Sequence, residues 1–461
     1  MFDSSSFKSL AQAAGDTLRR GLDQHVRLAV TGLSQAGKTA FITSLTDQLL
    51  HGSPSHLPFF PVVAEGRYQG AREMPQPHPL VPRFRYRDNL AQLTAESPAW
   101  APSTDGISEL RLHLRYLPDS GLRGFFKEPV TLVLDIVDYP GEWLLDLAML
   151  ELDYGQWSAQ QQVLLSQEPR KVLAGSWCLD ARAYGEGGVL DEARAEALAQ
   201  DYAALLTRLR QELGLYYLQP GRFLLPGALK GAPVLAFFPW QGEPDATNPC
   251  YQALAKVFEQ YKQEVVKRFY KEHFASMDRQ VVLIDTLAAL NHSRAAFLDL
   301  QLALTEILRS FQYGRSNLLQ RLFSPRIDRV LFAATQADRL TPEQRPALTS
   351  LLEELIRPAL EPIRYAGIEV GVETLAAVCT TLAGHSSLEG ELLPCLKGRL
   401  ADGRQVTLFP GDLPASLPGS DFWQRQGFAF PAFAPPLGLG SPLKHLRMDK
   451  ALAFLLGDKM T

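Results

Sequence analysis

A phosphate-binding pattern lies near the beginning of the chain. Residues 32–39 read GLSQAGKT, the complete GxxxxGK[ST] pattern. Its glycines let the backbone curl tightly and turn its N–H groups inward, where they and the following helix N-terminus hold a β-phosphate. Lys38 would reach the β- and γ-phosphate oxygens, and the Thr39 hydroxyl would bind Mg²⁺. The residues expected to contact the phosphates are Gly32, Ser34, Gln35, Ala36, Gly37, Lys38, Thr39 and Ala40.

A second motif, LDIVDYPGEW at residues 134–143, supplies carboxylates. Asp138 ends an apolar run three residues before Gly141. A carboxylate there can hold Mg²⁺ through water, and the Gly141 N–H can respond to the presence of a γ-phosphate. Asp135 is the competing residue, but strand alternation directs it to the opposite face of the sheet. We therefore expect Asp138 at the metal and a structural role for Asp135.

Two further residues near these motifs are candidates for the chemistry. In PSTDGISEL, at residues 102–110, a loop hydroxyl could give Mg²⁺ a second ligand that is released after hydrolysis. Thr104 is the first choice and Ser103 the second; a turn of small polar residues is the alternative. Glu142 follows the sensing glycine, where small GTPases have glutamine. It could orient the attacking water, but its negative charge predicts slow hydrolysis; alternatively it only begins the next helix.

The sequence also contains a candidate base-reading motif. Thr335-Gln336-Ala337-Asp338 ends an apolar strand and resembles the [NT]KxD motif of GTPases. A carboxylate at Asp338 accepts hydrogen bonds from guanine N1 and N2, whereas adenine offers no donors there. Gln336 replaces the usual lysine and covers less of the base, so an ATPase stays an alternative. Near the end of the next strand, Ala377, Val378 and Cys379 are expected, by their order in the chain, to present a backbone N–H to the guanine oxygen.

These motifs follow one another in the order seen in Ras-like proteins. The whole chain resembles the YcjX-like family of bacterial P-loop proteins, and the stretches GLSQAGKTAF, PSTDGISE, DYPGEW and TQAD carry the likeness. That family is described as stress-associated and nucleotide-binding, and older descriptions call it an ATPase. The resemblance implies a GTPase-like fold and a cytoplasmic protein, without naming a partner or a pathway.

The elements that must position these residues alternate between strand and helix. Apolar strands at 25–33, 279–287, 328–335 and 371–380 alternate with helical patterns, which predicts a mostly parallel, doubly wound α/β sheet of the Ras-like P-loop type. ELRLHLRYL and VTLVLDIV, at 109–117 and 130–137, predict a hairpin within it. Residues 142–278 have helical spacing and form a large helical insertion, with a strand expected near APVLAFFPW. A small β-hairpin insertion turns at Asp402-Gly403.

The predicted domain organisation follows from this pattern. It comprises an N-terminal amphipathic helix at 1–25, a discontinuous nucleotide domain at 26–141, 279–380 and 445–461, a loop-rich, proline-rich insertion at 52–103, the helical insertion at 142–278, and a hairpin-and-loop insertion at 381–444. The proline-rich insertion also offers arginines that could stabilise charge on a phosphate, without favouring one of them: Arg67, Arg72, Arg83, Arg85 and Arg87.

Composition excludes several classes of protein. The net charge is −4, so no basic field favours nucleic acid as a partner. Four widely spaced cysteines suit a reducing compartment, and we expect a cytoplasmic protein with neither secretory signal nor transmembrane helix. The first helix is expected to pack on the domain, with a weak peripheral membrane contact as the alternative.

The leading hypothesis is a Mg²⁺-dependent protein that binds GTP or GDP, hydrolyses GTP slowly and works as a conformational switch. The helical insertion would then meet a protein partner that the sequence does not identify. The alternative is a nucleotide-gated binding or scaffold module with negligible turnover.

Overall fold

A computed structural model describes residues 24–33, 35–102, 106–119, 128–311, 327–365, 367–388, 391–424 and 431–461. Some sequence predictions fall outside these ranges. They are most of the helix expected at residues 1–25, the phosphate-loop residue Ser34, and the loop hydroxyls of Ser103 and Thr104.

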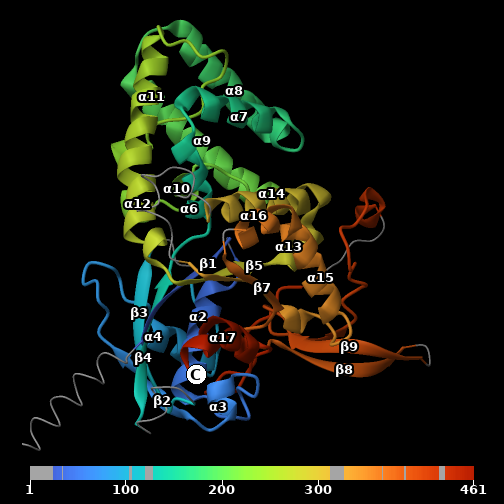
Figure 1. Cartoon of the computed structure of the whole chain (residues 1–461). Helices are drawn as coiled ribbons and strands as arrows, with labels where there is room; N and C mark the ends of the chain where they lie inside the picture. The colour runs from blue at the N-terminus through green and yellow to red at the C-terminus, as the bar shows by residue number, and fades with distance from the viewer. Residues whose placement is uncertain are drawn as a thin grey trace, which may run out of the picture.

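The described residues form a seven-stranded main sheet with the strand order β2-β3-β4-β1-β5-β6-β7 (Figure 1). Strands β4, β1, β5, β6 and β7 are parallel, β3 is antiparallel to β4, and β2 is antiparallel to β3. This confirms the predicted α/β class with a mostly parallel sheet. The strands are β1 (Gln24–Gly32), β2 (Tyr68–Met74), β3 (Ser108–Tyr116), β4 (Val130–Asp138), β5 (Arg279–Ile284), β6 (Arg329–Ala334) and β7 (Glu369–Thr374).

Helices cover both faces of this sheet because the central strands are apolar on both sides. All six residues of β5 are buried. Val281 and Leu283 pack with α2 (Lys38–His51) and α17 (Met448–Leu456) on one face. Val282 and Ile284 pack on the other face with α13 (Thr286–His292), α14 (Arg294–Ser310), α15 (Arg345–Ile356) and α16 (Leu360–Tyr365). This two-sided burial is typical of a doubly wound parallel sheet.

The segment between β4 and β5 is helical, and most of it lies at one end of the molecule, away from the sheet (Figure 1). A cluster of aromatic side chains, including Trp157, Phe237 and Phe258, forms its core. Its helices are α6 (Glu142–Leu145), α7 (Tyr154–Ser166), α8 (Arg170–Gly187), α9 (Glu192–Leu213), α10 (Gly221–Leu224), α11 (Pro249–Tyr261) and α12 (Lys267–Glu272), with 3-10 turns Asp146–Glu151 and Pro233–Leu235 and a π-helical turn Lys262–Val266.

The prediction of a strand near residues 232–240 is wrong. This stretch contains the turn Pro233–Leu235 followed by irregular backbone. Phe237 and Phe238 are consecutive and both fully buried, so the stretch has no alternating face to place on a sheet. Prolines at both ends also remove backbone donors that a strand would need.

The proline-rich segment at 52–103 is more ordered than its composition indicated. It contains α3 (Pro61–Ala64), α4 (Tyr86–Thr94) and strand β2, which extends the main sheet at one edge. A second, three-stranded antiparallel sheet contains β8 (Thr381–Leu388), β9 (Glu391–Arg399) and β10 (Gln405–Leu408). The predicted hairpin at Asp402-Gly403 joins β9 to β10, and β8 adds a strand to it.

The division into domains stays a prediction. Within the described ranges, no helix is both long and apolar enough to cross a membrane.

Candidate nucleotide-binding site

The candidate phosphate loop, residues 32–39, lies between β1 and α2, as the sequence pattern predicts. Gln35 and Gly37 both have left-handed backbone angles, with φ of 67° and 82°. These residues reverse the chain, and the Ala36 N–H donates to Leu33 O at 3.0 Å. No side chain among the described residues caps the N-terminus of α2. The N–H groups of its first turn are therefore available to an anion bound at the helix N-terminus.

The loop after β4 touches the phosphate loop directly. The Gly141 N–H donates to Gly32 O at 3.2 Å. A Cβ on Gly141 would lie only 2.8 Å from Gly32 C, so glycine is required for this approach. Asp138 is 1% exposed and lies in register with Val30 of β1, while Glu142 is buried at the start of α6. The second motif is thus placed beside the first.

Asp135, the competing carboxylate, lies within an ion-pair cluster on the sheet. Arg111 donates to both of its oxygens at 2.6 and 2.7 Å, and His25 Nε2 lies 2.7 Å from Oδ2. Burial raises the pKa of Asp135, but the hydrogen bonds from Arg111 and His25 outweigh this and hold the pKa below its ordinary value. The arrangement agrees with the structural role expected for Asp135.

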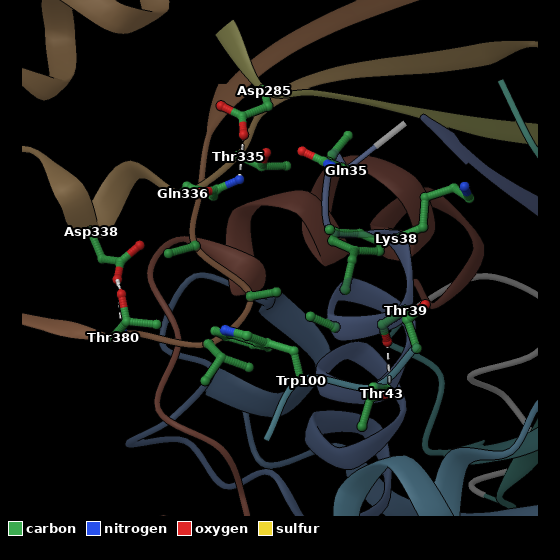
Figure 2. A pocket seen from close by; sticks show the side chains of 18 of the residues that line it. Gln35, Lys38, Thr39, Thr43, Trp100, Asp285, Thr335, Gln336, Asp338 and Thr380 are labelled. Carbon is green, nitrogen blue, oxygen red and sulfur yellow. Dashed lines mark hydrogen bonds between the residues drawn. The ribbon is translucent and has the colours of Figure 1, made fainter. Parts of the chain in front are cut away.

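A cavity of about 600 Å³ opens above the phosphate loop and extends to the ends of β5, β6 and β7 (Figure 2). Its size suits a small organic ligand. Several predicted residues meet there although they are far apart in the sequence. Those that line it are Gln35, Ala36, Gly37, Lys38, Thr39, Ala40, Thr335, Gln336, Asp338, Ala377 and Val378.

The Asp338 carboxylate is held by the loop after β7. Its Oδ2 accepts hydrogen bonds from the Thr380 N–H at 2.6 Å, the Thr380 hydroxyl at 2.7 Å and the Thr381 N–H at 3.3 Å. No described residue donates to Oδ1. One oxygen therefore fixes the side chain, and the other is left for a ligand donor. Figure 2 shows this contact at one side of the cavity.

The backbone expected to meet the guanine oxygen is only partly at the cavity. Ala377 and Val378 line it, but Cys379 does not, and its N–H donates to Lys444 O at 2.9 Å. Burial raises the pKa of the Cys379 thiol to about 12. Ala376 also lines the cavity, while its N–H donates to Leu446 O at 3.1 Å.

Some cavity residues were missed by the sequence reasoning. Trp100 is 40% exposed and reaches the cavity from the proline-rich segment, with its indole N–H on Phe433 O at 3.1 Å. Asp285 directly follows β5, and the rule that ligands bind at the carboxyl ends of parallel strands could have found it. Thr380 and Arg339 had no separate signal.

None of the arginines considered in the proline-rich segment lines the cavity. Arg83 and Arg87 donate to Glu73 at 2.7 and 3.0 Å, and Arg67 donates to Glu65 at 2.7 Å. Arg67, Arg83 and Arg87 are thus paired with carboxylates of the same segment.

Comparison with known proteins agrees with this arrangement. The family model described as "YcjX-like family, DUF463" matches residues 26–460. The chain belongs to the YcjX-like family. It is 44% identical over 472 residues to a protein of Escherichia coli K12 named "Ras-like GTPase YcjX", covering 98% of this chain and 100% of that protein.

A second YcjX-like protein of the same name, from Shewanella oneidensis, is 40% identical over 478 residues. The match covers 99% of both chains. The likeness to these YcjX-like relatives therefore includes the helical insertion and the second sheet as well as the phosphate loop.

Proposed function

We propose that this chain is a Mg²⁺-dependent GTP-binding protein that hydrolyses GTP slowly and acts as a conformational switch. One observation carries the proposal: one cavity joins the phosphate loop to the Asp338 carboxylate, which has one oxygen to which no described residue donates. A triphosphate would lie on the loop, and guanine N1 and N2 would donate to Asp338. The names of the relatives, which call them Ras-like GTPases, support the same nucleotide.

The residues near the phosphate loop fit a magnesium ion. The described residues contain no group of three or more His, Cys, Asp or Glu side chains that could hold a metal. Mg²⁺ at a nucleotide needs fewer protein ligands, because phosphate oxygens and waters complete its octahedron. The Thr39 hydroxyl and the buried Asp138 carboxylate are hard oxygen donors of the required kind. Thr104 stays a predicted second hydroxyl ligand.

Residues of this chain would position the nucleotide and neutralise the charge of its phosphates. Lys38 and the N–H groups of the loop would bind the β- and γ-phosphates, and the magnesium ion would neutralise developing charge on the phosphate oxygens. The Gly141 N–H, which donates to Gly32 O, would leave that carbonyl to reach a γ-phosphate. Glu142 would stand near the attacking water and add negative charge there, which is why we expect slow turnover.

The wider setting rests on the family resemblance. We propose a cytoplasmic protein of the bacterial stress response, whose helical insertion meets a protein partner when GTP is bound. A nucleotide-gated scaffold with negligible turnover is the second candidate. Gln336 in place of lysine keeps an ATPase as the third.

Measurements of nucleotide binding and phosphate release test the proposal. The wild-type protein should bind GTP more tightly than ATP and release phosphate slowly in the presence of Mg²⁺. Lys38→Ala should weaken triphosphate binding by on the order of tenfold or more, because it removes a charge-assisted contact. Lys397→Ala, on an exposed part of the second sheet, is the matched control and should bind normally.

Each outcome separates the candidates. Normal GTP binding by Lys38→Ala would contradict the assignment of the phosphate-binding site. Tight GTP binding without phosphate release above background would favour the scaffold. Equal affinities for ATP and GTP would end the argument for guanine.

A further inference from the structure

Gln336 lies where the GTPase motif has lysine, and a buried carboxylate holds it. The Gln336 backbone is left-handed, with φ of 60°, and its Nε2 donates to Asp285 Oδ2 at 2.5 Å. Asp285 follows β5, the strand next to β6, so the two residues reach the cavity from neighbouring strand ends. Figure 2 shows the Gln336 amide directed at Asp285 across the top of the cavity.

Asp285 is itself fixed in place. Its Oδ1 accepts the Ala288 N–H at 2.9 Å and caps α13, while Oδ2 accepts from Gln336. The residue is 7% exposed, and burial raises the pKa of its carboxyl group above the ordinary value despite these hydrogen bonds and the positive charges of Arg339 and Arg210. A carboxylate is costly at such a depth unless donors are directed at it. The Gln336 amide is one of the two donors.

The same hydrogen bond leaves the other end of the Gln336 amide without a partner. Its Oε1 is buried and accepts no hydrogen bond within the described ranges. A buried amide oxygen without a donor is unfavourable. The Gln336 amide is thus held in one orientation by Asp285, although that orientation does not satisfy its oxygen.

We propose that Asp285 is a positioning residue of the nucleotide site, which holds the Gln336 amide beside the nucleoside in the place where other GTPases use lysine. The inference rests on the proposed function, since it concerns the grip on a guanosine nucleotide. The pair lies at the strand ends that also carry Asp338, so it acts on the guanosine half of the ligand. Its effect on affinity is therefore the same for GTP, GDP and GMP.

Exchanging the donor and acceptor between the two residues tests this inference. Asp285→Asn keeps an oxygen for the Ala288 N–H but turns an amide donor toward the Gln336 donor. Isothermal titration should show an affinity about tenfold lower for GTP, GDP and GMP alike, because the Gln336 amide must turn over to accept from the new amide and so loses its native orientation. Asp285→Asn combined with Gln336→Glu restores a donor–acceptor pair and the net charge, and should recover most of the affinity.

A matched control separates positioning from helix capping. Asp191 caps α9 in the helical insertion by accepting the Arg194 N–H at 3.0 Å. Asp191→Asn should leave nucleotide affinity unchanged. Where Asp285→Asn does not fold, Gln336→Met keeps the cap intact and should lower the affinity for all three nucleotides by the same factor.

The results distinguish the inference from the proposed function. Unchanged affinity in Asp285→Asn, or in Gln336→Met where that variant replaces it, would overturn the positioning role. If the wild-type protein binds GTP but the double variant Asp285→Asn with Gln336→Glu does not recover the affinity, the positioning role is also overturned. A wild-type protein that binds no guanine nucleotide would overturn the proposed function and the inference with it.

Discussion

In the proposed nucleotide site, base recognition would depend on Asp338, whose two carboxylate oxygens have different surroundings. Thr380 and Thr381 occupy Oδ2, and no described residue donates to Oδ1. Asp338→Asn can keep an oxygen toward Thr380 and so turn an amine toward the guanine donors. We expect GTP affinity to fall by about tenfold or more, since two donors then face each other.

The complementary nucleotide provides the control for this variant. Xanthine has a carbonyl where guanine has its N2 amine, so Asp338→Asn should bind xanthosine triphosphate better than the wild-type protein does. Competition binding with GTP, ATP and xanthosine triphosphate measures all three affinities. A variant with unchanged preference for GTP would show that Asp338 does not read the base.

Glu142 is the residue that should limit the rate of hydrolysis. It is buried at the start of α6, next to the glycine that touches the phosphate loop. Glu142→Gln removes a negative charge near the expected γ-phosphate and should speed single-turnover hydrolysis by on the order of tenfold, with little change in GTP affinity. If the residue only begins α6, the rate will stay the same.

At the scale of elements, α10 and its flanking residues bind the segment after Gly141. The Gln219 side chain donates to Leu145 O at 2.6 Å, and the Trp143 indole N–H donates to Leu225 O at 2.9 Å. The Arg222 guanidinium lies over the Trp143 ring, 3.1 Å from its centroid. Residues 219–225 therefore form a clamp on residues 142–146, and we expect a movement of one segment to displace the other.

Gly221 is the position where this clamp can be opened. A Cβ there would clash with the Glu142 carbonyl, so Gly221→Ala must push α10 and α6 apart. We expect a lower midpoint of thermal unfolding and a faster release of GDP. Gly175→Ala, in the open middle of α8 where nothing lies within 4 Å of the added atom, should leave both quantities unchanged or raise the midpoint slightly. If the two variants have the same unfolding midpoint and the same rate of GDP release, residues 219–225 do not act as a clamp.

The clamp contains a carboxyl group whose titration should be measurable. Asp146 accepts hydrogen bonds from the Gly221 N–H at 2.7 Å and the Tyr261 hydroxyl at 2.6 Å, with the charge of Arg222 nearby. Burial nevertheless raises the pKa of Asp146 from 3.8 to about 6. As pH falls below 6, the folded protein takes up this proton before the unfolded chain does.

The stability that Asp146 contributes therefore depends on pH. It is fully present below pH 3.8 and is lost as pH rises through about 6. Lowering the pH from 6 to 5 should stabilise the wild-type protein relative to Asp146→Asn by at most about 1.4 kcal/mol. Denaturant unfolding at pH 5, 6 and 7 measures the difference, and a constant difference across this range would contradict the raised pKa.

Sequence patterns located the elements that bear the motifs but not those that complete the cavity. Apolar runs identified β1, β4, β5 and β6 because a buried parallel strand has a strong local signal. Strand β2 was missed, since it is an edge strand with a bulge near Gly70 and no fully buried residue. Trp100 reaches the cavity only through long-range contacts, such as its hydrogen bond to Phe433, which no local pattern encodes.

At the scale of the whole molecule, the helical insertion connects to the sheet on both sides of the phosphate-loop strand. It leaves the sheet after β4 and returns at β5, and β1 lies between these two strands (Figure 1). The first connection begins at Gly141, whose N–H is bonded to Gly32 of the phosphate loop. The clamp of residues 219–225 then joins that connection to the body of the insertion. A γ-phosphate that draws Gly141 away from Gly32 should therefore act on the insertion as a whole.

Hydrogen exchange can follow this coupling across the molecule. Exchanging GDP for a non-hydrolysable GTP analogue should change amide exchange in residues 141–151 and also in 215–225, because the two segments are bonded to each other. The second sheet, β8–β10, has no such bond to the clamp among the described residues and should exchange at the same rate with either nucleotide. Lys38→Ala should abolish the difference if the γ-phosphate causes it. Changes confined to the loop at Gly141 would instead mean that the insertion does not respond to the nucleotide, and that any partner bound there is recruited independently of the GTP state.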